Sequence, residues 1–339
     1  MAGTSTPALA AEVSNAGALG SIAVGAVDAA AARAMIDELK QRTQGPFNVN
    51  VFVHRPARAD KVCEQAWLKS LAPLFRTFDA EPPAQLREIY RSFCDDPLMA
   101  DMLAQTRPAV ASFHFGLPSK EVIARLKACG IALLSTATNL REAMEAERAG
   151  IDAVVAQGFE AGGHRGVFDP GAPDSQLAVA ALTRLLVRRL AIPVIAAGAI
   201  MDGAGIAAML ALGAEAAQLG TAFIGCPESG ADAHYRAALF GQGATATEMT
   251  AIISGRPARS LPNRFTQLQA DTLKALAPPD YPIAYDAAKA LDAAARAKGE
   301  GGFAAQWAGQ GAPLARALPA ATLVGILAEE LLAARARQA

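Results

Sequence analysis

The 339-residue sequence lacks several features that mark common protein classes. Its 31 Lys and Arg do not outnumber its 32 Asp and Glu, so the basic surplus typical of nucleic-acid and anionic-membrane binders is absent. The four cysteines form no C-x-x-C pair, which argues against a disulfide framework and against structural zinc. The longest apolar stretches, such as 190–201, contain Pro and Gly and are too short to span a bilayer. No charged segment followed by an apolar run opens the chain, so we expect a cytoplasmic protein with reduced thiols.

Apolar residues are abundant, at 52% of the sequence against 19% charged residues. This balance excludes a disordered chain and provides for a large core. Short runs rich in Val, Ile and Ala alternate with helix-like runs through the first two-thirds of the chain. Such runs are typical of parallel strands that are buried on both faces. We predict seven strands: Ser21–Ala26, Phe47–His54, Ala109–Gly116, Ile131–Ala137, Ala153–Gly158, Pro193–Ile200 and Ala216–Ile224.

Helix signals lie between these strands. Asn139 and Glu142 predict a capping box at the start of a helix that stops at Gly150. Asp202 is predicted to cap a helix over Gly203–Leu212. The regular alternation of strand and helix is typical of an α/β fold with a parallel sheet.

Seven strands in this alternation are one short of a (β/α)8 TIM-type barrel. The chain opens on residues 1–17, which look like a loop at a strand end followed by a helix. An open sheet would leave two bare edges, which proteins avoid, so we expect a TIM-type barrel whose first strand is truncated. In this interpretation residues 1–226 form the barrel, with an insertion at 55–107. Residues 227–339 form a mostly helical region beside the barrel mouth, where it can cap a substrate site, and its C-terminal helix returns to the barrel.

Glycines at the ends of the last two predicted strands indicate an anion site. In TIM-type barrels the loops after strands seven and eight hold phosphate groups. Here Gly198 and Ala199 end one strand, and Gln218-Leu219-Gly220-Thr221 ends the other. Main-chain N–H groups can approach a phosphate of FMN or of a phosphorylated substrate at such positions, although glycines used only for packing are the alternative. The Rossmann spacing G-x-G-x-x-G is absent, which disfavours a classical dinucleotide fold.

A glycine-rich loop follows the strand that ends at Gln157 and Gly158. It contains Gly162, Gly163 and His164, and its glycines allow close approach to a planar ring. Gln157 can bond to a ring carbonyl or N–H. His164 can act as a base or as an electrostatic partner.

Other polar residues leave alternatives open. His114 is either a substrate contact or a hydrogen-bonded histidine of the barrel rim. Asn50 either binds a cofactor or is a satisfied core residue. His54 and His234 have no functional context in the sequence and are interpreted as structural.

Two tyrosines and a lysine recur at four-residue spacing in Y-P-I-A-Y-D-A-A-K. If Pro282 begins a helix, then Tyr281, Tyr285 and Lys289 share one helix face. That face suits a small anionic substrate such as a carboxylate. A solvated face with a lysine lying over tyrosines fits the spacing equally well.

Together these motifs resemble the class I nitronate monooxygenases, essentially from end to end. The E-A-G-G-H-R-G and Q-L-G-T elements are the most specific, since the wider FMN-barrel superfamily shares the phosphate loops. The matching segments are M-A-G-T-S-T-P-A-L-A-A-E-V-S-N-A-G at the start, P-F-N-V-N-V-F at 46–52, G-F-E-A-G-G-H-R-G at 158–166, P-V-I-A-A-G-A-I-M-D-G at 193–203, A-A-Q-L-G-T-A-F at 216–223, S-G-R-P-A-R at 254–259 and W-A-G-Q-G at 307–311.

The resemblance implies an FMN-dependent enzyme that oxidises alkyl nitronates, propionate 3-nitronate above all, with O2 to a carbonyl product and nitrite. Detoxification is the implied role, and His164 is the implied catalytic residue. The implied FMN contacts are Met1, Asn50, Gln157, Gly162, Gly163, Gly198, Ala199, Gln218, Leu219, Gly220 and Thr221. The implied substrate pocket is Tyr90, His114, Tyr235, Tyr281, Tyr285 and Lys289. An NADH:quinone reductase on the same FMN barrel and a non-catalytic flavin-binding module are the alternatives.

Overall fold

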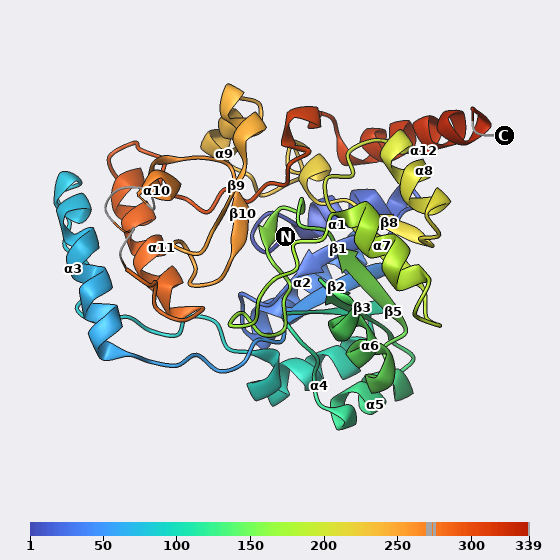
Figure 1. The fold of residues 1–339 in the computed structure, drawn as a ribbon, viewed down its shortest axis with the longest axis horizontal. Coiled ribbons are helices and arrows are strands. Elements are labelled where there is room, and N and C mark those ends of the chain that lie inside the picture. Colours follow the sequence, from blue (N-terminus) through green and yellow to red (C-terminus); the bar gives the residue numbers. More distant parts are fainter. Residues whose placement is uncertain (269–272, 274–275, 338–339) are drawn as a thin grey trace.

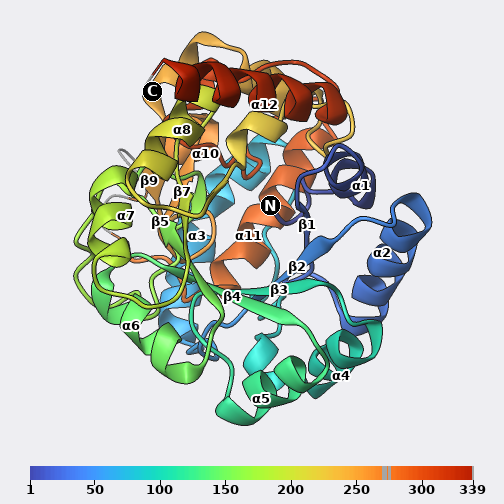
Figure 2. The same ribbon diagram turned by 90° about the vertical axis from the view of Figure 1, so that its right-hand side faces the viewer.

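The computed structural model of the chain describes residues 1–268, 273 and 276–337. At its centre is a sheet of seven parallel strands in the order β1-β2-β3-β4-β5-β7-β8, which curls with helices on its outside (Figure 2). The predicted barrel-type α/β fold is therefore confirmed, and so are all seven strands. Within the described residues no pairing joins β1 to β8. The strands are β1 (Gly20–Ala23), β2 (Phe47–Phe52), β3 (Val110–His114), β4 (Ala132–Ala137), β5 (Ala153–Gln157), β7 (Val194–Ala197) and β8 (Ala216–Gln218).

Most of the outer helices lie between the strands in sequence, as the alternation predicted, while α1 precedes β1 and α12 follows β8. The last helix, α12, packs against α8 and α1 and so returns to the barrel. None of the helices in the described ranges has the length and apolar character needed to cross a membrane. The outer helices are α1 (Pro7–Asn15), α2 (Ala29–Arg42), α4 (Pro97–Thr106), α5 (Lys120–Ala128), α6 (Leu140–Ala149), α7 (Val179–Val187), α8 (Gly203–Ala211) and α12 (Ala320–Ala336).

The caps of α6 agree with the prediction in part. Asn139 Oδ1 accepts from the Glu142 N–H at 3.0 Å, and Gly150 ends the helix with φ +89°. The reciprocal bond differs, because the Glu142 carboxylate accepts from the N–H of Thr138 at 2.8 Å and from its hydroxyl at 2.7 Å. The same carboxylate accepts from the Phe168 N–H at 3.0 Å. It therefore joins the end of β4 to the segment that follows the glycine-rich loop.

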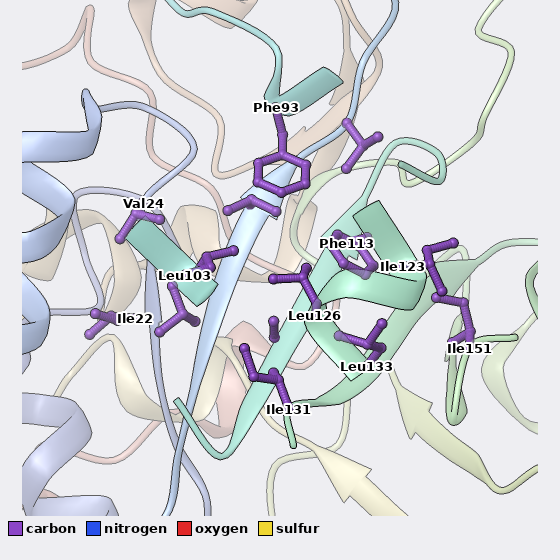
Figure 3. Packing of buried hydrophobic residues seen from close by; sticks show 14 of the residues in the cluster. Ile22, Val24, Phe93, Leu103, Phe113, Ile123, Leu126, Ile131, Leu133 and Ile151 are labelled. Atoms are coloured by element: carbon purple, nitrogen blue, oxygen red, sulfur yellow. The ribbon is translucent and has the colours of Figure 1, made fainter. Parts of the chain in front are cut away.

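The largest apolar core lies between the sheet and its outer helices. Leu103 of α4 and Leu126 of α5 pack there with Phe113 of β3 (Figure 3). Because α4 contributes to this core, the second half of 55–107 is the crossover helix between β2 and β3 and does not belong to an insertion. The first half forms α3 (Lys61–Thr77), which packs on α11 of the C-terminal region.

A second correction concerns the end of β8. The strand was predicted to run to Ile224, but it stops at Gln218. The chain turns there because the Phe223 N–H bonds to the carbonyl of Gly220 at 3.0 Å, and Thr221–Phe223 form one 3-10 turn. The turn exposes main-chain N–H groups at the strand end.

The C-terminal region lies beside the barrel (Figure 1). Its strand β10 (Ala258–Ser260) pairs with β9 (Glu248–Thr250) and with β6 (Gly163–His164), which lies within the glycine-rich loop. The helices of this region are α9 (Ala233–Leu239), α10 (Arg264–Gln267) and α11 (Ile283–Arg296). The small sheet therefore attaches the C-terminal region to the loop after β5.

We expect Glu142→Ala to lower the free energy of unfolding by about 3 kcal/mol, because it leaves the buried donors of Thr138 and the half-buried N–H of Phe168 without an acceptor. Urea denaturation at neutral pH measures this change. Glu145→Ala, on the exposed face of the same helix, should stay within about 0.5 kcal/mol of the parent. Equal stability of the two variants would contradict the bridging role of Glu142.

Candidate active site

A cavity of about 650 Å³ lies at the carboxyl ends of the strands, between the barrel and the C-terminal region. This volume is in the usual range for sites that bind small molecules and cofactors. The structure brings all but one of the predicted site residues to this cavity. Leu219 is the exception, because its side chain packs in apolar clusters beneath α8 and α12. The predicted residues that line the cavity are Met1, Asn50, Tyr90, His114, Gln157, Gly162, Gly163, His164, Gly198, Ala199, Gln218, Gly220, Thr221, Tyr235, Tyr281, Tyr285 and Lys289.

Free main-chain N–H groups lie at the ends of β7 and β8. Those of Ala199, Gly220 and Thr221 donate no hydrogen bond within the described residues, and all three residues line the cavity. Ala199 has φ +51° and follows Gly198 at φ +140°, so the chain turns sharply after β7. A Cβ on Gly220 would meet only the Met1 side chain, at 3.6 Å. Concave turns with free N–H groups bind anions, so this part of the cavity can hold a phosphate.

Polar side chains of β1, β2 and β3 form a ladder across the barrel end of the cavity. Asn48 Nδ2 donates to Ser21 Oγ at 2.8 Å and to Ser112 Oγ at 2.9 Å. Asn50 Nδ2 donates to Ser112 Oγ at 2.9 Å, and its Oδ1 has no partner among the described residues. Asn50 therefore presents a hydrogen-bond acceptor to a ligand in the cavity.

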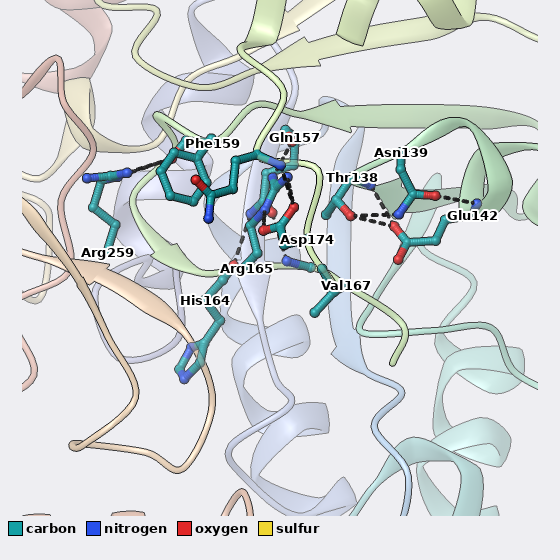
Figure 4. Close-up of polar contacts among 12 residues, drawn as sticks. Thr138, Asn139, Glu142, Gln157, Phe159, His164, Arg165, Val167, Asp174 and Arg259 are labelled. Carbon is teal, nitrogen blue, oxygen red and sulfur yellow. Dashed lines mark hydrogen bonds and ion pairs between the residues drawn. The ribbon is translucent and has the colours of Figure 1, made fainter. Parts of the chain in front are cut away.

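Gln157 holds the glycine-rich loop in place (Figure 4). Its Nε2 donates to the carbonyl of His164 at 3.0 Å, and its Oε1 accepts from the Gly166 N–H at 2.7 Å. The buried Arg165 forms an ion pair with Asp174 at 2.7 Å and so ties down the outer side of the loop. Gln157 thus supports the main chain around His164, while one Nε2 proton remains for a ligand.

The two histidines of the cavity are held in different ways. His114 contacts Thr136 Oγ1 through Nδ1 at 3.0 Å and the His164 carbonyl through Nε2 at 3.2 Å. Both of its nitrogens are occupied by the protein, as expected of a rim histidine that supports the loop. His164 contacts Ser254 Oγ through Nε2 at 3.0 Å, and its ring centroid lies 5.2 Å from that of Trp307.

The tyrosines and the lysine gather on the side of the cavity formed by the C-terminal region. Trp307 Nε1 donates to the Tyr285 hydroxyl at 3.1 Å, and Tyr235 donates its hydroxyl proton to the Trp307 carbonyl. The Lys289 ammonium lies 4.9 Å from the centre of the Tyr90 ring. Because Trp307 already donates to Tyr285, the phenol proton of Tyr285 is free to bond a substrate acceptor.

The expected helix register needs one correction. Helix α11 begins at Ile283, with Pro282 in the capping position, so Tyr281 precedes the helix. The Tyr281 and Tyr285 rings still lie 6.4 Å apart, edge to face. The Tyr281 hydroxyl is buried without a hydrogen-bond partner in the described residues. It can therefore form a hydrogen bond with a ligand or a water molecule in the cavity.

Burial keeps three histidines neutral. It lowers the pKa of His114 to about 3 and, together with the nearby Arg256 guanidinium, lowers the pKa of His54 to about 4. It lowers the pKa of His164 well below its ordinary value, helped by His114 and Arg256. Burial also raises the pKa of Tyr281 and Tyr285, so both phenols keep their protons. The cavity thus offers a neutral imidazole and neutral phenols.

Several residues in the cavity or directly behind it had no signal in the sequence. Asn48 and Ser112 lie at alternate positions of ordinary strands, and only the strand register shows that they face the cavity. Trp307 lies in W-A-G-Q-G, a segment that resembled the family but gave no indication of what Trp307 does. Ser254 and Arg256 lie in S-G-R-P-A-R, and their proximity to His164 depends on the pairing of β6 with β10.

The buried histidines predict a loss of stability in acid. In the unfolded chain their pKa is near 6.5, while the folded-state pKa of His54 is about 4 and that of His114 about 3. Below pH 6.5 the unfolded chain therefore binds more protons, and the free energy of unfolding falls by up to about 1.4 kcal/mol per pH unit for each histidine. Above the unfolded-state pKa, these histidines do not make the free energy of unfolding depend on pH. Urea denaturation between about pH 7.5 and about pH 5.5 measures it.

Two variants separate the buried histidines from other acid effects. His114→Asn should make the acid slope shallower, because one of the three histidines no longer takes up a proton on unfolding. Gln41→Asn, which exchanges one exposed amide for another, should leave the slope unchanged, because it changes no titratable group. An acid slope that stays the same in His114→Asn would show that this histidine is protonated equally in both states.

Comparisons with known proteins agree with the motifs. The sequence model of the family described as nitronate monooxygenase matches residues 1–330. A nitronate monooxygenase of Paraburkholderia phytofirmans is 61% identical over 98% of this chain and 90% of its own length. One of Pseudomonas aeruginosa is 56% identical over 98% of this chain and 94% of its own length.

Solved structures give the same result. The nitroalkane oxidase of Streptomyces ansochromogenes superposes with a TM-score of 0.92 at 40% identity, over 99% of this chain and 95% of its own. FabK from Thermotoga maritima superposes with a TM-score of 0.74 at 28% identity, over 100% of this chain and 92% of its own. The resemblance found in the motifs is confirmed, and the chain belongs to the nitronate monooxygenase family of enzymes.

Proposed function

We propose that the chain catalyses the FMN-dependent oxidation of alkyl nitronates by O2 to a carbonyl product and nitrite. The observation that carries this proposal is one cavity with free main-chain N–H groups at the ends of β7 and β8 and the neutral His164 in the glycine-rich loop. Family membership implies a flavin. The free N–H groups at the ends of β7 and β8 can hold one phosphate, which favours FMN. We also propose that the protein is cytoplasmic, since all four cysteines are free and reduced thiols fit a reducing compartment. Removal of toxic nitronates is the role that we propose for this reaction.

The residues present fit FMN. Ala199, Gly220 and Thr221 offer N–H groups to its phosphate, and Asn50 Oδ1 offers an acceptor to a ring N–H. A Cβ on Gly163 would meet only Trp307 Cβ, at 3.8 Å, so this position leaves room for a planar ring beside the loop. Bound FMN supplies the electron transfer between substrate and O2. The protein binds and orients both partners and keeps bulk water away.

His164 has two candidate roles, a charged partner of the anionic nitronate or a neutral acceptor. The burial that lowers its pKa favours the neutral form at physiological pH. A neutral His164 accepts a hydrogen bond or removes the α-proton of a nitroalkane. The negative charge of the nitronate must then be stabilised by groups other than His164. The phenol hydroxyls of the pocket can donate hydrogen bonds to it.

We propose propionate 3-nitronate as the substrate because the pocket pairs hydrogen-bond donors with a lysine at its mouth. The exposed Lys289 ammonium lies over Tyr90, where it can reach a substrate carboxylate. In this proposal residues 1–226 hold FMN, and residues 227–339 with α3 cover the substrate.

Anaerobic mixing of the FMN-loaded protein tests the function directly. We expect propionate 3-nitronate to reduce the flavin and NADH to leave it oxidised, as followed by the visible absorbance of the flavin. Reduction by NADH alone would support a quinone reductase. A flavin that responds to neither compound, nor to ethyl nitronate, would support a non-catalytic binding module.

Lys289→Met tests the substrate carboxylate. We expect the KM for propionate 3-nitronate to rise about tenfold, because a charge-assisted hydrogen bond is lost. The KM for ethyl nitronate, which has no carboxylate, should change little. Lys298→Met is the matched control, since Lys298 pairs with Asp79 on the surface at 2.8 Å. Equal changes for both substrates would remove Lys289 from carboxylate binding.

A further inference from the structure

A tight turn at Ser254–Arg256 packs directly against the catalytic-site histidine. The pairing of β6 with β10 sets His164 opposite Ala258, so the residues just before β10 reach the imidazole. Ser254 is fully buried, and its hydroxyl lies 3.0 Å from His164 Nε2. This hydroxyl is the one hydrogen-bond partner of the imidazole ring among the described residues.

The hydroxyl of Ser254 has one proton and two possible acceptors. The Arg256 carbonyl lies 3.0 Å from Oγ, and the Arg256 N–H donates to Oγ at 3.3 Å. The alternative acceptor is His164 Nε2. Arg256 is buried, and within the described residues its carbonyl has no other donor. A buried carbonyl without a donor costs about 1–3 kcal/mol, so the serine proton goes to the carbonyl.

The remaining contact then has a fixed direction. With its proton on the Arg256 carbonyl, Ser254 Oγ can only accept from His164, and the imidazole proton must be on Nε2. We propose that Ser254 is a positioning residue that selects the Nε2–H tautomer of His164 and leaves the lone pair of Nδ1 free for the cavity. Its effect on turnover rests on the proposed function, whereas the tautomer itself does not.

The turn is built to hold this hydroxyl still. Gly255 has φ +86°, and a Cβ there would lie 2.2 Å from the Pro279 carbonyl oxygen, so no other residue fits without a shift. The Gly255 N–H donates to the Ala251 carbonyl at 2.8 Å. The Arg256 guanidinium lies 4.1 Å from the centre of the Phe115 ring and donates to the Val167 carbonyl. These contacts fix the turn on both sides of Ser254.

The tautomer decides what His164 can do. With the proton on Nε2, the neutral ring has an acceptor on Nδ1 and no donor toward the cavity. It can take a proton or a hydrogen bond from a bound molecule. Without Ser254 the buried Nε2–H would lose its acceptor, and the proton would move to Nδ1, where water in the cavity can accept it. The acceptor would then be lost.

Nitrogen NMR of the FMN-loaded protein with 15N-labelled histidine tests the tautomer without substrate. We expect the His164 signals, assigned by their absence in His164→Gln, to show a protonated Nε2 and an unprotonated Nδ1. Ser254→Ala should move the proton to Nδ1 in most molecules. Ser260→Ala is the matched control, because Ser260 is buried on β10 and its hydroxyl bonds to the Gln306 carbonyl at 3.0 Å and to no histidine. Its spectrum should match the parent.

Kinetics supply the second readout. Ser254→Ala should lower kcat for nitroethane, a neutral nitroalkane whose α-proton needs the Nδ1 acceptor, about tenfold or more while FMN stays bound, and Ser254→Thr, which keeps the hydroxyl, should restore most of the loss. A protonated Nδ1 in the parent protein would overturn the proposal even if Ser254→Ala failed to fold. The predicted tautomer in a protein inert to all nitronates would overturn the proposed function alone.

Discussion

The site depends on one constraint, the close approach of two main-chain segments at Gly162. A Cβ at this position would lie 2.4 Å from the N of Gly309, so the loop after β5 and the segment around 309 can meet only where a side chain is missing. Main-chain bonds hold the contact on both sides: Gln310 N donates to the Glu160 carbonyl at 2.9 Å, and Arg165 N to the Pro257 carbonyl at 2.8 Å. His164 and Trp307 face the same cavity because this contact exists.

The same contact explains the electrostatics of the cavity. Closing the C-terminal region over the barrel removes His54, His114 and His164 from water, and burial disfavours their charged forms. Arg256 is buried with them and forms no ion pair within the described residues. Its pKa is lowered to about 10, so it stays charged at physiological pH. One fixed cation therefore sits behind a layer of neutral groups, a setting that favours negative charge in the cavity while the histidines stay free to accept protons.

The sequence predicted what local patterns encode. Strand runs, helix caps and the glycines at 162, 163 and 198 are read from neighbouring residues, and the structure has them where they were expected. The early end of β8 reflects a local turn, in which the Phe223 N–H bonds to the Gly220 carbonyl, whereas the other misses depend on partners distant in the chain. Helix α4 was taken for an insertion, since its apolar face has meaning only against α2 and α5. Ser254 could not be assigned before the register of β6 against β10 was known.

The two sides of the cavity are made in different ways, and in the proposed function one side holds the cofactor and the other side holds the substrate. The barrel side offers main-chain N–H groups and short polar side chains of adjacent strands, which need only the fold. The other side offers tyrosines, Trp307 and Lys289 from the C-terminal region, which need particular side chains. FabK shares the fold over the whole chain at 28% identity but is a differently named protein, and a shared fold does not imply a shared function. Substrate choice in this chain should therefore follow the aromatic side of the cavity, where the side chains of the C-terminal region, rather than the fold, decide what can bind.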